Sequence, residues 1–148
     1  MKKASIYILK EKIIIHPESK ANAGFWLSDE HVVILPVNAS PEEIINGINE
    51  SLSKSRMGLP DPKDWSSFDK QLLANMGLKS WAPIKRKSTK YCSVECDNNV
   101  IVFIPTAHDT GNSGAGFTFK TSDAVKVINS VDNNELFKAF KLALEKCE

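Results

Sequence analysis

Two capped helices, each preceded by a short apolar strand, constrain the fold of this chain more than any other feature of its sequence. In the first, Ser40, Pro41 and Glu43 supply the cap, the first-turn proline and the third-position acid of a capping box. Apolar residues then recur every four positions, at Ile44, Ile48 and Leu52. The pattern predicts an amphipathic helix that begins after Ser40 and ends near Lys54.

The same arrangement returns 92 positions later in the sequence. Asp132 takes the cap position and Glu135 the acidic one, and the apolar face consists of Leu136, Phe140 and Leu144. The strands before the two helices also match, Val33 and Leu35 with Val125 and Val127. Duplication of an ancestral unit would explain this match. A pattern that any capped strand–helix unit shares would also explain it, so both interpretations stay open.

The other segments predict short strands, loops and one more helix. Strands are expected at 5–9, 13–15, 24–27, 32–37, 89–96, 100–104, 117–119 and 125–128. Loops are expected at 17–23, 57–67 and 106–116, and a short helix is expected from Phe68 to Met76, capped by Ser66 or Ser67 and stopped by Gly77. Asp97-Asn98-Asn99 predicts the turn of a hairpin, and Pro105 is expected to end its second strand.

These elements predict one α+β domain over 1–148, with a mixed or antiparallel β-sheet and about three α-helices packed on it. With 42% hydrophobic and 25% charged residues, a chain of 148 residues can bury a core without disulfides or a metal. The longest apolar runs have the length of strands, so no membrane span is expected. The basic N-terminus has no cleavage site after it, and the three cysteines suit a reducing compartment, which predicts a cytoplasmic protein.

The residues that carry chemistry are scattered, which argues against an enzyme. Cys92 and Cys96 on one strand would lie about 13 Å apart, too far for a disulfide or a shared metal, and are expected in the core. Cys147, near the end of the chain, is expected to be exposed. His108 beside Asp109 is the best acid–base candidate, but a surface loop histidine explains it better. We therefore expect no catalytic residue, no metal and no cofactor.

Charge is segregated along a chain whose net charge is only +1. Five acids and no lysine or arginine fall between residues 21 and 53. This suits docking to a basic partner, because complementary potentials speed association. The opposite pattern occurs at 79–90, where five basic residues surround Trp81. An RNA- or nucleotide-binding protein that uses 79–90 and the His108 loop is therefore the alternative interpretation.

The order of short motifs resembles the immunity proteins of contact-dependent growth inhibition (CDI), the CdiI type. These motifs are Gly24-Phe25-Trp26, Leu35-Pro36, Ser40-x-x-Glu43-Ile44, Leu52-x-x-Ser55-Arg56, Trp65, Leu72-Leu73, Lys79-Ser80-Trp81 and Ile104-Pro105. The resemblance implies a cytoplasmic protein without enzymatic activity. It also implies a protein partner, the cognate toxin domain at the C-terminus of a large surface-exported protein.

Many such toxins are nucleases with basic substrate grooves, so the resemblance implies an acidic surface that occludes the toxin's active site. The contact residues expected from this chain are Asp29, Glu30, Glu42, Glu43, Asp61, Asp64, Trp65 and Asp109. In this interpretation Trp65 is an aromatic anchor in the proline-bounded loop. No direct contact with nucleic acid or with a membrane is expected.

Overall fold

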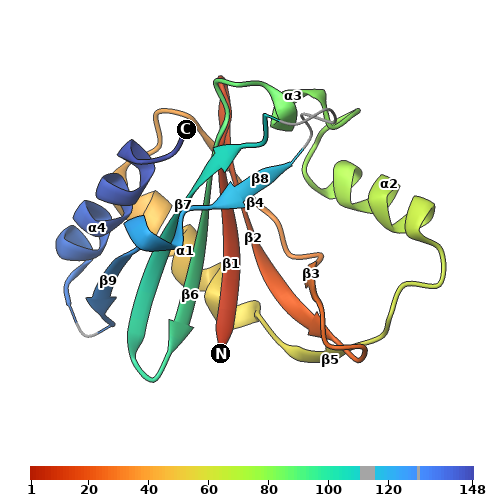
Figure 1. Ribbon diagram of the computed structural model, residues 1–148, viewed down its shortest axis with the longest axis horizontal. Helices are drawn as coiled ribbons and strands as arrows, with labels where there is room; N and C mark the ends of the chain where they lie inside the picture. Colours follow the sequence, from red (N-terminus) through yellow and green to blue (C-terminus); the bar gives the residue numbers. More distant parts are fainter. Residues whose placement is uncertain (111–115, 130) are drawn as a thin grey trace.

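The computed structural model describes residues 1–110, 116–129 and 131–148. The strands are β1 (Lys2–Ile8), β2 (Lys12–Ala21), β3 (Trp26–Ser28), β4 (Val33–Pro36), β5 (Met57–Leu59), β6 (Lys90–Asp97), β7 (Val100–His108), β8 (Phe117–Phe119) and β9 (Val125–Ile128). The helices are α1 (Pro41–Lys54), α2 (Trp65–Asn75), α3 (Ala82–Lys85) and α4 (Asn133–Glu145), with a 3₁₀ turn η1 at Thr121–Asp123. The predicted α+β class is confirmed (Figure 1).

All nine strands of the described residues join one curled sheet, a half-barrel. The main path runs β3-β2-β1-β6-β7-β8, while β4 and β5 pair with β2 and β9 pairs with β7. Every pairing is antiparallel except that of β2 with β5, so the sheet is mixed. The hairpin between β6 and β7 turns at Asn98 and Asn99, which both have positive φ, as a tight hairpin requires.

The two sides of the sheet are covered by different helices. On one side α1 and α4 pack against Ile6, Ile15 and Phe103 in the larger hydrophobic core. A smaller core forms on the other side around Ile14, where Leu72 comes from α2, Met76 is the residue that caps the end of α2, and Ile84 comes from α3. In Figure 1, α2 stands at the edge of the molecule away from α4. The sheet is therefore buried on both sides, which is why Tyr91 and Ser93 are buried as well as Cys92 and Val94.

The two capped helices begin as the sequence predicts. In α1, the Ser40 hydroxyl accepts from the Glu43 amide and the Glu43 carboxylate accepts from the Ser40 amide, both at 3.2 Å, which completes the capping box. In α4, the Asp132 carboxylate accepts from the Glu135 amide at 2.9 Å.

The structure contains an internal repeat. The first repeat is β1-β2-β3-β4-α1 and the second is β6-β7-β8-β9-α4, in the same order and with the same pairings. The registers correspond: Ile6 opposes Ile15 in the first hairpin, as Val94 opposes Phe103 in the second. In the same way, Ile13 opposes Leu35 and Ile101 opposes Val127.

The hydrogen bonds outside the regular elements repeat too. The Asp29 amide donates to the Pro17 carbonyl and the Lys120 amide to the Pro105 carbonyl, both at 2.8 Å. Likewise, Lys20 donates to Arg56 and His108 donates to Glu148, both at 2.9 Å between backbone atoms. A shared strand–helix pattern would not repeat these irregular bonds, so the structure supports the duplication interpretation.

Residues 57–88 lie between the two repeats and belong to neither. This segment, which we call the insert, consists of β5, α2, α3 and their connections. It is the part of the chain in which the described structure departs from the internal symmetry.

Three expectations about strands and loops were wrong or incomplete. Residues 17–21 are not a loop, because β2 continues through them to pair with β3 and β5. Pro105 does not end its strand: β7 continues to His108, and Pro105 stands where the partner changes from β6 to β8. The predicted loop 57–67 contains β5 and the start of α2. Of the glycine-rich loop 106–116, residues 111–115 lie outside the described part of the chain.

Two further expectations were wrong in detail. The cap of α2 is Asp64 rather than Ser66 or Ser67, because the Asp64 carboxylate accepts from both of their amides. Cys147 is buried rather than exposed, with its thiol donating to the Tyr91 carbonyl at 3.3 Å. Burial raises the pKa of that thiol.

Candidate protein-interaction site

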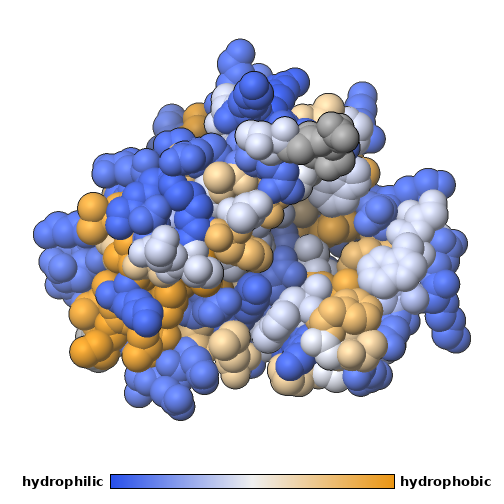
Figure 2. All heavy atoms as spheres, viewed as in Figure 1, coloured by the Kyte–Doolittle hydropathy of each residue, from blue (hydrophilic) through white to orange (hydrophobic). Residues whose placement is uncertain are grey.

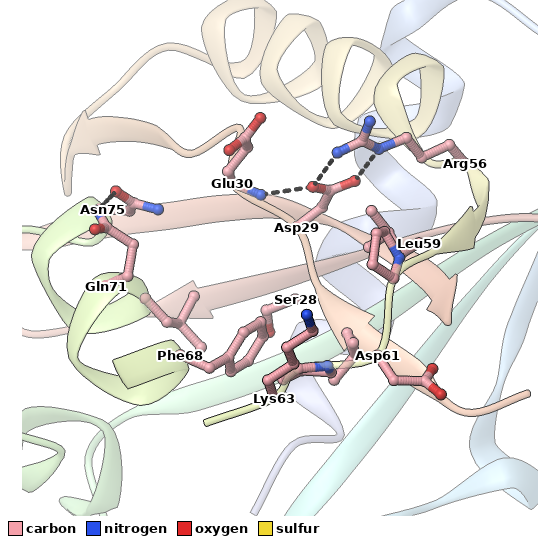
Figure 3. Close-up of a pocket in the computed structure, with 14 residues that line it drawn as sticks. Ser28, Asp29, Glu30, Arg56, Leu59, Asp61, Lys63, Phe68, Gln71 and Asn75 are labelled. Atoms are coloured by element: carbon pink, nitrogen blue, oxygen red, sulfur yellow. Dashed lines mark hydrogen bonds and ion pairs between the residues drawn. The ribbon is translucent and has the colours of Figure 1, made fainter. Parts of the chain in front are cut away.

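A cavity of about 450 Å³ lies between the insert and the first repeat. Residues of β3 and the bend after it form one wall, and β5, the following loop and α2 form the other. We call it the insert cavity (Figure 3). Its lining is mainly apolar and comes from Leu27, Leu59, Pro60, Pro62, Phe68 and Leu72. In Figure 2 the surface is hollowed between the sheet and α2.

An ion pair closes one end of the insert cavity. The Asp29 carboxylate is 7% exposed and accepts from Arg56 Nε at 2.9 Å and from Nη2 at 3.2 Å. It also accepts from the Ser19 hydroxyl at 2.6 Å and from the Glu30 amide at 2.8 Å. Burial alone would raise the pKa of Asp29, but these hydrogen bonds together lower it. The carboxylate therefore fixes the bend after β3 to the start of β5.

Replacing Asp29 with asparagine should lower the free energy of unfolding at pH 7 by about 2 kcal/mol, because a charged buried hydrogen-bond acceptor is lost. The folded-state pKa of Asp29 is depressed, so its contribution is present above the unfolded pKa of about 4 and lost as pH falls through the folded value. Urea unfolding at pH 7 and at pH 3 measures the loss of stability and its dependence on pH. The difference in free energy of unfolding between wild type and variant should be smaller at pH 3 than at pH 7. A difference that does not depend on pH would contradict this role.

The rim of the insert cavity carries charges that this ion pair does not use. Glu30 stands on the rim beside Asp29, and Asp61 and Lys63 come from the loop after β5. Asp61 accepts from the Ala23 amide at 3.0 Å, which ties that loop to the turn between β2 and β3. On α2, Gln71 donates to Asn75 at 2.9 Å along the opposite edge. The rim is thus polar and the interior apolar, which is the usual composition of a binding pocket.

An exposed row of aromatic side chains lies next to the insert cavity. Trp65 is 52% exposed, and its ring lies 5.8 Å from Phe25 and 5.8 Å from Phe68, measured between centroids. Phe68 belongs to the cavity lining, so the row continues the apolar surface outward. Trp65 is the first residue of α2, where the Asp64 cap holds the helix end. The sequence placed Trp65 in a loop, whereas the helix fixes its position.

Three of the eight predicted contact residues, Asp29, Glu30 and Asp61, line the insert cavity, and two more, Asp64 and Trp65, lie at the start of α2 beside it. The other three lie elsewhere. Glu42 and Glu43 occupy the exposed first turn of α1, and Asp109 follows β7, where it accepts from the Thr118 hydroxyl. The cavity-lining residues Leu27 and Phe68 had no signal in the sequence, because their exposure depends on the distance between β3 and α2.

A buried polar cluster on the α2 side of the sheet was also missed. The rings of His16 and Tyr91 both stack on Tyr7, at 5.9 and 4.6 Å. The Ser5 hydroxyl donates to Glu18 at 2.8 Å and lies 3.1 Å from the Tyr91 hydroxyl. Burial raises the pKa of Tyr7 and of Tyr91. Within the cluster Ser5 and His16 are fully buried, and among the described residues no group of three or more His, Cys, Asp or Glu could hold a metal.

The structure also brings together residues of the alternative interpretation. Lys85, Lys87 and His108 line a second cavity of about 540 Å³. The walls of this cavity include Asp109 and Glu148, so it is not uniformly basic. His108 is held in place, with Nε2 2.6 Å from the Thr89 carbonyl oxygen and its ring 4.5 Å from that of Phe117. The His108 ring therefore packs β8 against the C-terminal end of β7.

The model of a family described as "CdiI: CDI immunity protein" matches residues 2–147. A solved structure of a protein of unknown function from Neisseria meningitidis superposes with a TM-score of 0.78 and is 18% identical, over 99% of this chain and 95% of that chain. A "CdiA-CT/CdiI toxin and immunity complex" from Yersinia pseudotuberculosis contains a chain that superposes with a TM-score of 0.75 and is 19% identical, over 99% of this chain and 97% of that chain.

No curated protein matches the chain. At these identities the two structures establish the fold alone. Among the described helices none is long and apolar enough to cross a bilayer.

Proposed function

Because the chain belongs to the CdiI family of CDI immunity proteins, we propose that it binds and neutralises a cognate toxin, the C-terminal domain of a surface-exported CDI protein. The toxin is a nuclease with a basic substrate groove, and this protein occludes its active site in the cytoplasm without catalysing a reaction. The contact surface is centred on the insert cavity. The family match across nearly the whole chain is the observation that carries the proposal.

Two further observations support it. The complex from Yersinia pseudotuberculosis contains an immunity chain of the same fold, and its printed description includes a CdiA toxin domain. In this chain, the insert cavity joins an apolar interior, exposed Trp65 and the carboxylates of Glu30 and Asp61. Interfaces of high affinity commonly combine an aromatic anchor with a charged rim.

The proposal is tested with the C-terminal domain of any CDI protein whose gene lies directly upstream of the gene for this chain. Co-expression of the full chain should restore the growth of cells that produce the toxin domain. The purified proteins should form a complex with a Kd on the order of 10⁻⁸ M, as is common for interfaces of standard size. Isothermal titration calorimetry measures the affinity, and a toxin nuclease assay with and without the chain measures inhibition.

The outcomes separate the parts of the proposal. Growth protection without complex formation would contradict direct neutralisation. A complex in which the toxin still cleaves RNA would contradict occlusion of the active site. Filter binding of mixed RNA to the chain alone, at low and moderate salt, tests the alternative that uses 79–90 and His108. Retention of RNA at moderate salt that is lost on replacing Lys85 and Lys87 would favour that alternative.

A further inference from the structure

The insert cavity has two properties that together restrict what can fill it. Its interior is lined by Leu27, Leu59 and Phe68, so a polar group at the bottom would lose its water without gaining a partner. Its lining also includes Glu30, an exposed residue beside the Asp29–Arg56 ion pair whose negative charge acts on Arg56. An occupant therefore needs an apolar body and a charged or polar end that reaches the rim.

We infer that the insert cavity takes the side chain of one lysine or arginine of the toxin, with its methylene stem against the apolar wall and its cation at Glu30. This inference rests on the proposed function and names the group that the partner inserts. Lysine and arginine side chains bury an apolar stem while they keep the charged end at a polar boundary. A basic toxin presents such residues, and the carboxylates on the rim complement their charge.

The remaining charges of the rim agree with this occupant. Asp29 and Arg56 neutralise each other through two hydrogen bonds, so Arg56 does not repel an incoming cation as a free guanidinium would. Of the other charged lining residues, Glu30 and Asp61 are acidic and Lys63 is basic, and Asp61 already accepts from the Ala23 amide. Lys63 adds a positive charge to the same lining and repels a second cation there, so its removal should strengthen binding.

Three substitutions in the full chain test the inference, with the Kd for the purified toxin domain measured by calorimetry. Glu30→Gln should weaken binding by about tenfold, and Lys63→Gln should strengthen it by about threefold, because both change only the charge on the rim. Gln71→Trp should weaken binding by about tenfold, because the indole fills the cavity from α2. Ala74→Trp, at an exposed position of the same helix outside the cavity, is the matched control and should leave the Kd within twofold.

Each pattern of results decides a different point. If Gln71→Trp has no effect, the cavity stays empty in the complex and the inference is wrong. If Gln71→Trp weakens binding but both charge variants are neutral, the occupant is an uncharged apolar side chain, which also overturns it. If Glu30→Gln instead strengthens binding and Lys63→Gln weakens it, the occupant is acidic, which also overturns the inference. The proposed function fails separately, when the wild-type chain itself does not bind the toxin.

The toxin side supplies an independent check. Each lysine and arginine of the toxin domain is replaced with methionine, and binding is measured to wild type and to Glu30→Gln. One position should show non-additive effects with Glu30→Gln, since residues in contact couple and distant ones do not. Additive effects at every position would contradict a direct contact between Glu30 and a toxin cation.

Discussion

The double substitution of Glu30 and Asp61 with lysine should reduce the rate constant for association with the toxin by about 10-fold to 100-fold at low ionic strength. Both carboxylates stand on the rim of the insert cavity, and reversing them replaces attraction of a basic partner with repulsion. The effect should shrink as salt is raised towards about 0.5 M, because screening shortens the reach of surface charges to a few ångströms. Stopped-flow fluorescence of Trp65, which is exposed next to the cavity, can follow the association.

The control carries the same change in total charge at remote positions, Glu11→Lys with Glu145→Lys. A second comparison, Glu42→Lys with Glu43→Lys, tests whether the first turn of α1 belongs to the interface, as the sequence suggested. Equal slowing by the cavity double variant and the remote control would show that only net charge matters. That result would remove the insert cavity from the interface.

Replacing Phe103 with alanine should lower the free energy of unfolding by about 4 kcal/mol, the largest stability effect expected for a single side chain here. Phe103 is fully buried on β7, and its ring centroid lies 5.8 Å from that of Phe140 on α4, so the substitution leaves a cavity between the sheet and its helix. Equilibrium unfolding in urea measures the change. Phe119→Ala, at a side chain that is 44% exposed, should cost less than about 1 kcal/mol.

The internal repeat gives this prediction a second control. Ile15 and Ile48 occupy the positions of Phe103 and Phe140 in the first repeat, and both are fully buried. Ile15→Val removes one methylene and should cost about 1 kcal/mol. A Phe103→Ala variant no less stable than Ile15→Val would mean that the α4 side of the core can collapse to fill the space.

The two capped helices α1 and α4 and the main hairpins could be predicted because their signals are local, whereas the short helix α3 was not predicted. The Ser40 and Asp132 caps, the four-residue spacing of Ile44 and Ile48, and the Asn98-Asn99 turn all act within a few residues. The continuation of β2 past Pro17 could not be predicted, because β3 and β5 supply its partners from elsewhere in the chain. The start of α2 at Trp65 depends on Asp64, whose capping role competes with two nearby serines.

The candidate site was predictable only in part. Acidic segregation suggested Glu30, and the resemblance led to Asp61 as a further contact residue, but nothing in the sequence shows that the insert brings them to one cavity. Asp29 was grouped with them because of its charge alone. Its four hydrogen bonds instead give it a supporting role, which depends on Arg56, a residue 27 positions away in the sequence.

The two repeats contain corresponding ion pairs in which the acidic and basic residues are exchanged. Where the first repeat has Asp29 with Arg56 at 2.9 Å, the second has Lys120 with Glu148 at 2.9 Å, so acid and base have exchanged places. Two like halves could in principle offer a partner two like docking positions. The exchanged charges give each half an electrostatic signature of its own, and a toxin that recognises one half meets the reverse pattern on the other. Such a near-symmetric scaffold can therefore hold a single toxin molecule in a single orientation.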